Sequence, residues 1–215
     1  MNRLKTLCRA LCLATALVST AGLATAASSL STSGGTSTSL SGVPGMFDPN
    51  WFGDASMYTS AFDLGSMLKG ASLLLTQPAA VTYMLVGFEA GFNNALVSGG
   101  ERLNNRSGAY ANLGSSISFS QVTASPLDFS FLSNGSGSLF SNGNSNTGVI
   151  LSADRQSALL LFNDAFSGDG DFDDMVVRVT ISSVPEPEAL AMLLAGLGVV
   201  TAVVRRRRSK AVRSV

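Results

Sequence analysis

The sequence predicts an all-β fold for the middle of the chain, an antiparallel β-sandwich or jelly-roll-like domain over residues 46–183. Short apolar or alternating segments recur there between clusters of Gly, Asn, Ser and Pro, which is typical of strands joined by turns. Residues 27–184, a stretch of roughly 158 residues, show no long 3.6-residue periodicity and have the length of one domain. Helices are therefore expected only at the two ends, as an N-terminal signal helix and a C-terminal transmembrane helix.

Residues 1–26 have the layout of a secretory signal peptide. Basic residues precede an apolar segment at 10–18, and the small residues Ala24 and Ala26 occupy the cleavage positions, so a cut is expected after Ala26. Both cysteines of the chain, Cys8 and Cys12, lie in the part to be removed, and neither has the context of a lipoprotein. The exported domain therefore has to fold without disulfides.

The elements of the domain are predicted in chain order from turn residues and alternation. Residues 27–45 form a Ser/Thr/Gly-rich segment that is either a flexible linker or, over 28–41, a ragged first strand. Strands are expected at 71–77, 81–88, 115–122, 127–132, 157–162 and 175–182. In 81–88, the odd-numbered residues from Val81 fall on one face and the even-numbered residues from Thr82 on the other. The serine-rich strand 115–122 is expected at an edge, and 134–148 is expected to be a loop.

Charge and composition exclude several classes of function. Between residues 27 and 184, five basic residues stand against twelve acidic ones, a net charge of −7 that disfavours nucleic acid and suits divalent cations or a hydrated polysaccharide. The chain has no histidine, which removes the commonest general base and any Ser-His-Asp triad. Carboxylates for a hydrolase could be drawn from Glu89 and Glu101, but Glu89 is expected to cap the chain or to pair with Arg102 or Arg106. We therefore expect no enzymatic activity.

The acidic segment near residue 170 is the candidate metal site. Its oxygen-bearing side chains are Asn163, Asp164, Asp169, Asp171, Asp173 and Asp174. Ca²⁺ takes about six to eight oxygen ligands, and a bound cation would offset the mutual repulsion of these carboxylates. The spacing is not that of an EF-hand, since Asp174 stands where that loop needs glycine and Thr180 where it needs glutamate. Two interpretations stay open: a Ca²⁺ site in a β-hairpin loop, or a solvated turn whose aspartates keep a sheet edge soluble.

Residues 184–208 contain three parts in a fixed order. These are Pro185, Glu186 and Pro187, then a helix predicted at 188–204, then Arg205, Arg206, Arg207 and Arg208. Residues 189–204 carry no charge and would extend about 24 Å as a helix, a little short of the roughly 30 Å hydrocarbon core of a membrane. Because basic flanks stay in the cytoplasm, residues 209–215 are expected inside and the domain outside.

This order of motifs closely resembles the C-terminal signal of the bacterial PEP-CTERM proteins. Two internal segments are similar to segments of the same group: LVGFEAGFNN at 85–94, and LFND at 161–164 followed by DGDFDDMVV at 169–177. The second also resembles an acidic hairpin of the domain of unknown function DUF4114, with Asp173 in place of an asparagine. The resemblance implies export in a Gram-negative bacterium, an inner-membrane-anchored intermediate, and processing at Pro185, Glu186 and Pro187 by an exosortase-type membrane protease.

Three classes of function follow from these features. The first is a structural or adhesive protein of the cell surface or extracellular matrix, in an exopolysaccharide or biofilm context. The second is a calcium- or carbohydrate-binding surface module, for which Trp51, Phe52 and Tyr58 would supply exposed aromatic rings. The third is an enzyme, which would need carboxylates that converge in a pocket.

Overall fold

The computed structural model describes residues 27–42, 52–53, 61–89, 91–107, 110–121, 124–133, 136–164, 170–183 and 187–211. Several predicted features lie outside these described residues. They are the signal peptide with Ala24 and Ala26, the aromatic residues Trp51 and Tyr58, the candidate ligand Asp169, and Pro185 and Glu186 of the tail.

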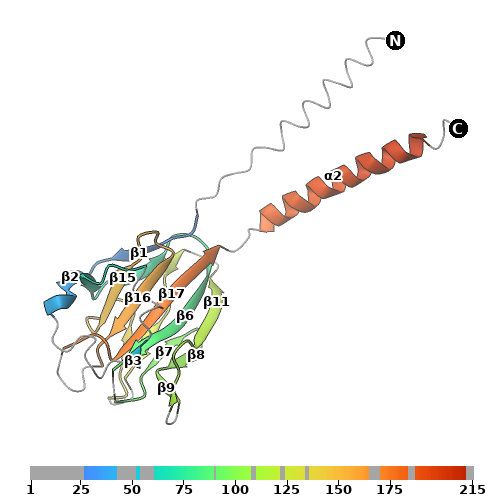
Figure 1. Cartoon of the computed structure of the whole chain (residues 1–215). Helices are drawn as coiled ribbons and strands as arrows, with labels where there is room; N and C mark the ends of the chain where they lie inside the picture. The colour runs from blue at the N-terminus through green and yellow to red at the C-terminus, as the bar shows by residue number, and fades with distance from the viewer. Residues whose placement is uncertain are drawn as a thin grey trace.

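One layer of the domain is an eight-stranded antiparallel sheet (Figure 1). Its order is β11 (Ser116–Gln121), β6 (Ala79–Phe88), β17 (Met175–Ser183), β16 (Ser157–Phe162), β15 (Thr147–Leu151), β4 (Ser66–Lys69) and β2 (Thr36–Ser39), and β3 (Phe52–Gly53) also pairs with β6. The long strands β6 and β17 are neighbours, paired from Ala79 and Ser183 at one end to Gly87 and Val176 at the other. These two strands define the two ends of the domain.

Two smaller antiparallel sheets make up the opposite layer. The first has the order β1 (Leu30–Ser33), β5 (Ser72–Leu75) and β12 (Ser125–Pro126). The second has the order β14 (Leu139–Ser141), β13 (Ser130–Leu132), β7 (Ala95–Ser98) and β8 (Glu101–Asn104). A short strand pair, β9 (Arg106–Ser107) with β10 (Tyr110–Ala111), and the 3-10 helix η1 (Leu40–Gly42) lie between longer elements. The prediction of an all-β antiparallel domain is confirmed for the described residues.

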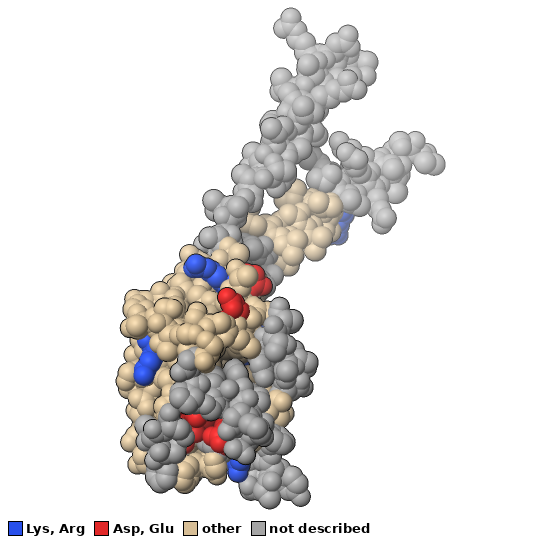
Figure 2. All heavy atoms as spheres, turned by 60° about the vertical axis from the view of Figure 1, so that its left-hand side comes forward, with Lys and Arg blue, Asp and Glu red and all other residues tan. Residues whose placement is uncertain are grey.

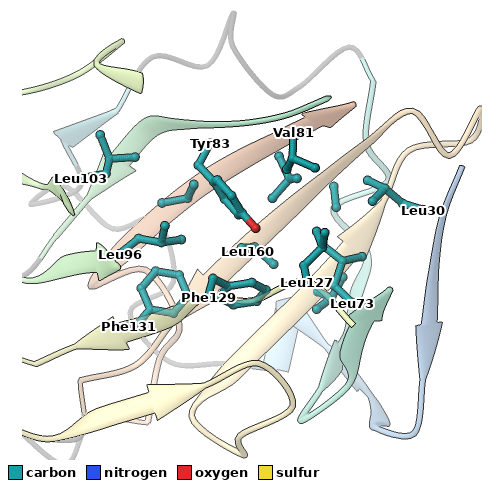
Figure 3. Packing of buried hydrophobic residues seen from close by; sticks show 14 of the residues in the cluster. Leu30, Leu73, Val81, Tyr83, Leu96, Leu103, Leu127, Phe129, Phe131 and Leu160 are labelled. Atoms are coloured by element: carbon teal, nitrogen blue, oxygen red, sulfur yellow. The ribbon is translucent and has the colours of Figure 1, made fainter. Parts of the chain in front are cut away.

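The main core lies between the two layers (Figure 3). Tyr83 projects from β6 towards Phe129 of the opposite layer, with 6.0 Å between their ring centroids. Phe131 of β13 stacks on Phe162 of β16 with centroids 4.6 Å apart. Val81 and Tyr83 are fully buried in this core, as the predicted alternation of β6 requires. Burial in this apolar environment raises the pKa of the Tyr83 hydroxyl far above its ordinary value of 10.0.

A smaller core covers the other face of the eight-stranded sheet, where Val86 packs in the same cluster as Phe172. The register between β6 and β17 shifts between Val176 and Val177, and Val86 is the residue that this shift passes over. Such a β-bulge changes which face the following side chains occupy. Phe88 accordingly lies in the main core, so the face predicted for it from its even number is wrong.

Two polar segments contain more strand structure than a simple loop would. Residues 28–41 include β1 and β2, which pair with β5 and β4, so the strand interpretation of this segment holds and the flexible linker does not. The loop predicted at 134–148 is wrong in part, because β14 lies within it and β15 begins in it. Leu139 and Phe140 of β14 stand opposite Leu132 and Phe131, and this pairing forms the strand. Residues 115–122 do contain an edge strand, β11.

The C-terminal helix α2 spans Pro187–Ala211 and contains the helix predicted at 188–204. It begins four residues after Ser183, the last residue of β17. The arginine block lies within its last two turns. Large apolar side chains of α2 are exposed, from Met192 at 71% to Val200 at 59%. No helix among the described residues combines the length and the hydropathy needed to cross a membrane.

Candidate functional site

Three carboxylates converge at one end of the eight-stranded sheet. They belong to Glu89, Asp171 and Asp173, and one oxygen atom from each lies within 4.8 Å of the others. Asp173 is fully buried, Asp171 is 5% exposed and Glu89 is half-buried. We call this group the acidic triplet. Like charges this close repel one another strongly where water is partly excluded, so the arrangement favours a cation among them.

The backbone fixes the members of the acidic triplet relative to one another. Glu89 directly follows β6, and Asp171 and Asp173 lie four and two residues before β17, its antiparallel neighbour. The Glu89 amide donates a hydrogen bond of 2.9 Å to the Asp173 carbonyl oxygen. Asp173 also forms an isolated bridge with Phe162 at the end of β16. Three neighbouring strands therefore hold the site, and the bulge at Val86 decides on which face the residues after it lie.

Asp164 and Asp174 form a second, structural layer beside the triplet. The Asp174 carboxylate accepts a hydrogen bond of 2.7 Å from the Asp164 amide. The Asp164 carboxylate accepts one of 3.0 Å from the Asn94 side chain. These bonds join the segment after β16 to the segment before β17 and to the segment before β7. Hydrogen bonds of this kind satisfy buried carboxylates, and both side chains are nearly completely buried.

Asn163 lies at the same end of the domain and forms hydrogen bonds through its backbone. Its amide donates to the Asn146 carbonyl at 3.0 Å, and its carbonyl accepts a hydrogen bond from the Asn146 side chain at 3.1 Å. The strand end that carries Asp164 is thereby tied to the turn before β15. Of the predicted ligands, Asp171 and Asp173 lie in the acidic triplet, whereas Asn163, Asp164 and Asp174 build the frame around it.

Two basic side chains flank the site by lying over aromatic rings. The Lys69 amino group is 5.1 Å from the centroid of Phe172, which lies between Asp171 and Asp173 in the sequence. The Arg106 guanidinium is 5.0 Å from the centroid of Phe88, the residue before Glu89. Cation–π contacts hold these positive charges at the end of the domain that carries the acidic triplet, which we call the acidic end. Figure 2 shows acidic side chains near both ends of the domain, with one group at the end that lies away from α2.

The donor set fits a hard divalent cation better than a transition metal. It consists of carboxylate oxygens, which Ca²⁺ prefers, and contains neither histidine nor cysteine. Three carboxylates supply only part of the six to eight oxygens that Ca²⁺ takes, so backbone carbonyls and water would have to complete the shell. Glu89 was not among the ligands predicted from sequence, because its sequence neighbours pointed to a cap or an ion pair. The signal that could have found it is its position directly after the strand that pairs with the acidic hairpin.

The acidic triplet and the sorting segment lie at opposite ends of the same strands. β6 is 10 residues long, or about 30 Å at roughly 3.4 Å per residue. Its first residue, Ala79, pairs with Ser183, four residues before α2 begins. Its last residue, Phe88, precedes Glu89. In a protein held at its C-terminus, the acidic triplet therefore points away from the attachment.

Comparison with known proteins identifies the C-terminal segment. Residues 183–208 match the family model of the PEP-CTERM protein-sorting motif, and this region includes Pro185, Glu186, Pro187 and the arginine block 205–208. No match was found among curated proteins or among solved structures. The predicted sorting signal is thus confirmed, and it implies export as a membrane-anchored precursor and exosortase-dependent sorting. The match supports the prediction that this chain is a PEP-CTERM protein.

Proposed function

We propose that the β domain is a structural or adhesive component of the cell surface or extracellular matrix, in an exopolysaccharide or biofilm context, and that Ca²⁺ binds at its acidic end. The tail, with the helix at 188–204, delivers the domain as a membrane-anchored precursor to an exosortase-type protease. In this proposal the domain itself catalyses nothing. The host is a Gram-negative bacterium, and the acidic hairpin is of the DUF4114-like kind.

One observation carries the calcium part of the proposal. The carboxylates of Glu89, Asp171 and Asp173 approach within 4.8 Å although two of the three residues are buried. Removing charge from water is costly unless the charge is compensated, and a divalent cation compensates several carboxylates at once. Extracellular calcium modules bind with dissociation constants of about 10⁻⁴ to 10⁻³ M, which suits a protein that meets the ion only after export.

A calcium- or carbohydrate-binding surface module is the alternative, and the position of β3 favours it. Phe52 pairs with Phe88 in the register of β3 and β6, so its backbone lies one residue away from the acidic triplet. Sugars stack on aromatic rings, and Ca²⁺ bridges sugar hydroxyls to carboxylates in many binding sites. Binding of soluble exopolysaccharide that requires Ca²⁺ and is lost in Phe52→Ala would favour this alternative.

The calcium proposal is tested by thermal unfolding of residues 27–184, a fragment that keeps every strand of the described fold. Added Ca²⁺ is expected to raise the Tm of the native fragment, because a ligand that binds only the folded state stabilises it. The double variant Asp171→Asn/Asp173→Asn should lose this rise. Glu101→Gln is the control, since Glu101 is an exposed carboxylate in β8, outside the triplet. A Tm that millimolar Ca²⁺ leaves unchanged would contradict the calcium proposal, and the buried Asp171 and Asp173 would then be structural.

A further inference from the structure

The sorting motif and the folded domain share a residue. The matched motif begins at Ser183, and Ser183 is also the last residue of β17, paired with Ala79 of β6. Only Val184 separates this strand from Pro185. A protease that reads the Pro-Glu-Pro segment therefore meets its substrate directly at the end of a sheet.

Little chain separates the strand from the segment that the protease reads. Pro185 comes two residues after Ser183, which is about 7 Å of fully extended chain. A single transmembrane helix of a membrane protease is about 10–12 Å in diameter. Extended peptides are bound through their main-chain amides and carbonyls. Ser182 and Ser183 are paired with Ala80 and Ala79 of β6, so the side of their main chain that faces β6 is not open to a protease in the folded domain.

The last two residues of β17 differ in burial from the residue before them. Ser182 and Ser183 pair with Ala80 and Ala79 of β6, and both of their side chains are exposed. On the β16 side, the described register ends at Thr180. Separation of these two serines from β6 therefore takes no buried side chain of β17 out of the core.

Ile181 marks the point where separation becomes costly. Its side chain is only 5% exposed and belongs to the main core. Its amide donates a hydrogen bond of 3.0 Å to the Gln156 carbonyl, so it is held on the side away from β6 as well. The strand can thus open as far as Ser182 while the core stays closed.

We propose that Ser182 and Ser183 form a detachable end of β17, which leaves β6 when the exosortase-type protease engages the Pro-Glu-Pro segment, with Ile181 as the limit of opening. The protease thereby gains two more residues of extended substrate. After cleavage the same residues return to β6, and the released domain keeps all of its strands. The proposal rests on the sorting motif alone and does not depend on calcium.

Two engineered disulfides in the full-length chain test this proposal. Ala80→Cys/Ser182→Cys locks the detachable end to β6, and Thr82→Cys/Thr180→Cys places the same lock two residues further from the tail. Residues offset by two belong to the same class of antiparallel pair, so the two locks are matched in geometry. The native cysteines are confined to the signal peptide predicted at residues 1–26, so no other thiol competes in the exported domain.

The measurement is the ratio of processed to unprocessed protein in cells that contain the protease, with disulfide formation checked by thiol alkylation. Processing is expected to be lost in the Ala80/Ser182 lock and kept at the native level in the Thr82/Thr180 lock. The single variants Ser182→Cys and Thr180→Cys should be processed like the native chain. Native processing of the Ala80/Ser182 lock would overturn the proposal, and so would loss of processing in both locks or in Ser182→Cys alone.

Discussion

Glu89→Gln should change the stability of the domain in opposite directions with and without Ca²⁺. The glutamine keeps the size and an acceptor oxygen of the native side chain but removes one of three carboxylates that lie within 4.8 Å of one another. At this separation a pair of like charges costs about 3.5 kcal/mol at an effective dielectric constant of 20 and about 0.9 kcal/mol in bulk water. Because Glu89 is half-buried, we expect a value between these limits.

Without Ca²⁺, the variant is therefore expected to raise the free energy of unfolding by about 1–3 kcal/mol. For a domain of this size, each kcal/mol corresponds to about 2–4 °C in Tm. With saturating Ca²⁺, the native fragment should instead be the more stable of the two. Its three carboxylates bind the ion better than the variant's two, so the ion adds more to its free energy of unfolding. Added salt should shrink the difference measured without Ca²⁺, since Glu89 is partly open to solvent.

The assay is thermal or urea unfolding of native and Glu89→Gln fragments, each in chelator and in Ca²⁺. Glu101→Gln is again the control, because it removes the same charge from an exposed site outside the triplet. Equal destabilisation of Glu89→Gln in chelator and in Ca²⁺ would refute the reasoning. It would mean that the Glu89 carboxylate serves as a structural hydrogen-bond acceptor and not as a repelled charge.

Two further predictions concern the fold. Gly35 has a φ of +82°, and a Cβ added there would lie 2.7 Å from the Ala71 Cβ, whereas Gly34 has a φ of +70° and open space around it. Gly34→Ala should therefore lower the free energy of unfolding by about 1–2 kcal/mol from backbone strain alone, and Gly35→Ala should lower it clearly more. Urea unfolding measures both losses, and equal losses would contradict the clash at Gly35. The raised pKa of Tyr83 means that the folded state holds the phenol proton more tightly, so stability is complete below pH 10 and falls as pH rises beyond it. Tyr83→Phe should weaken this alkaline loss in pH-dependent unfolding, and an unchanged alkaline profile would exclude Tyr83 as its source.

Much of the sheet is predictable because its long strands have strong local patterns. β6 alternates apolar residues on its core face from Val81 to Leu85, β16 is an apolar run bounded by turns, and β17 alternates from Val177 to Ile181, so period and length identify them. The four-residue strands β4, β7 and β8 carry too few residues for such a pattern. β14 exists because β13 offers it a partner, which is a tertiary contact that no local window contains.

Only two of the three carboxylates of the candidate site could be predicted from the sequence. Asp171 and Asp173 alternate in a single short segment, and their spacing alone indicates a cluster. Glu89 is more than eighty residues away in sequence and reaches them only because β6 and β17 are neighbours. The β-bulge at Val86 comes from a register shift between two strands, and the only sign of it in β6 is the neighbouring Gly87, which does not by itself fix the shift. Pairing of distant strands is thus the information that the sequence pattern lacks.

The most direct test of the proposed site is calorimetric titration of Ca²⁺ into the fragment 27–184, beside the same titration of Glu89→Gln/Asp173→Asn. We expect saturable binding with a dissociation constant of about 10⁻⁴ to 10⁻³ M in the native fragment, and strongly weakened binding in the double variant. Absence of binding in the native fragment, or equal binding in both, would contradict the assignment of Ca²⁺ to the acidic triplet.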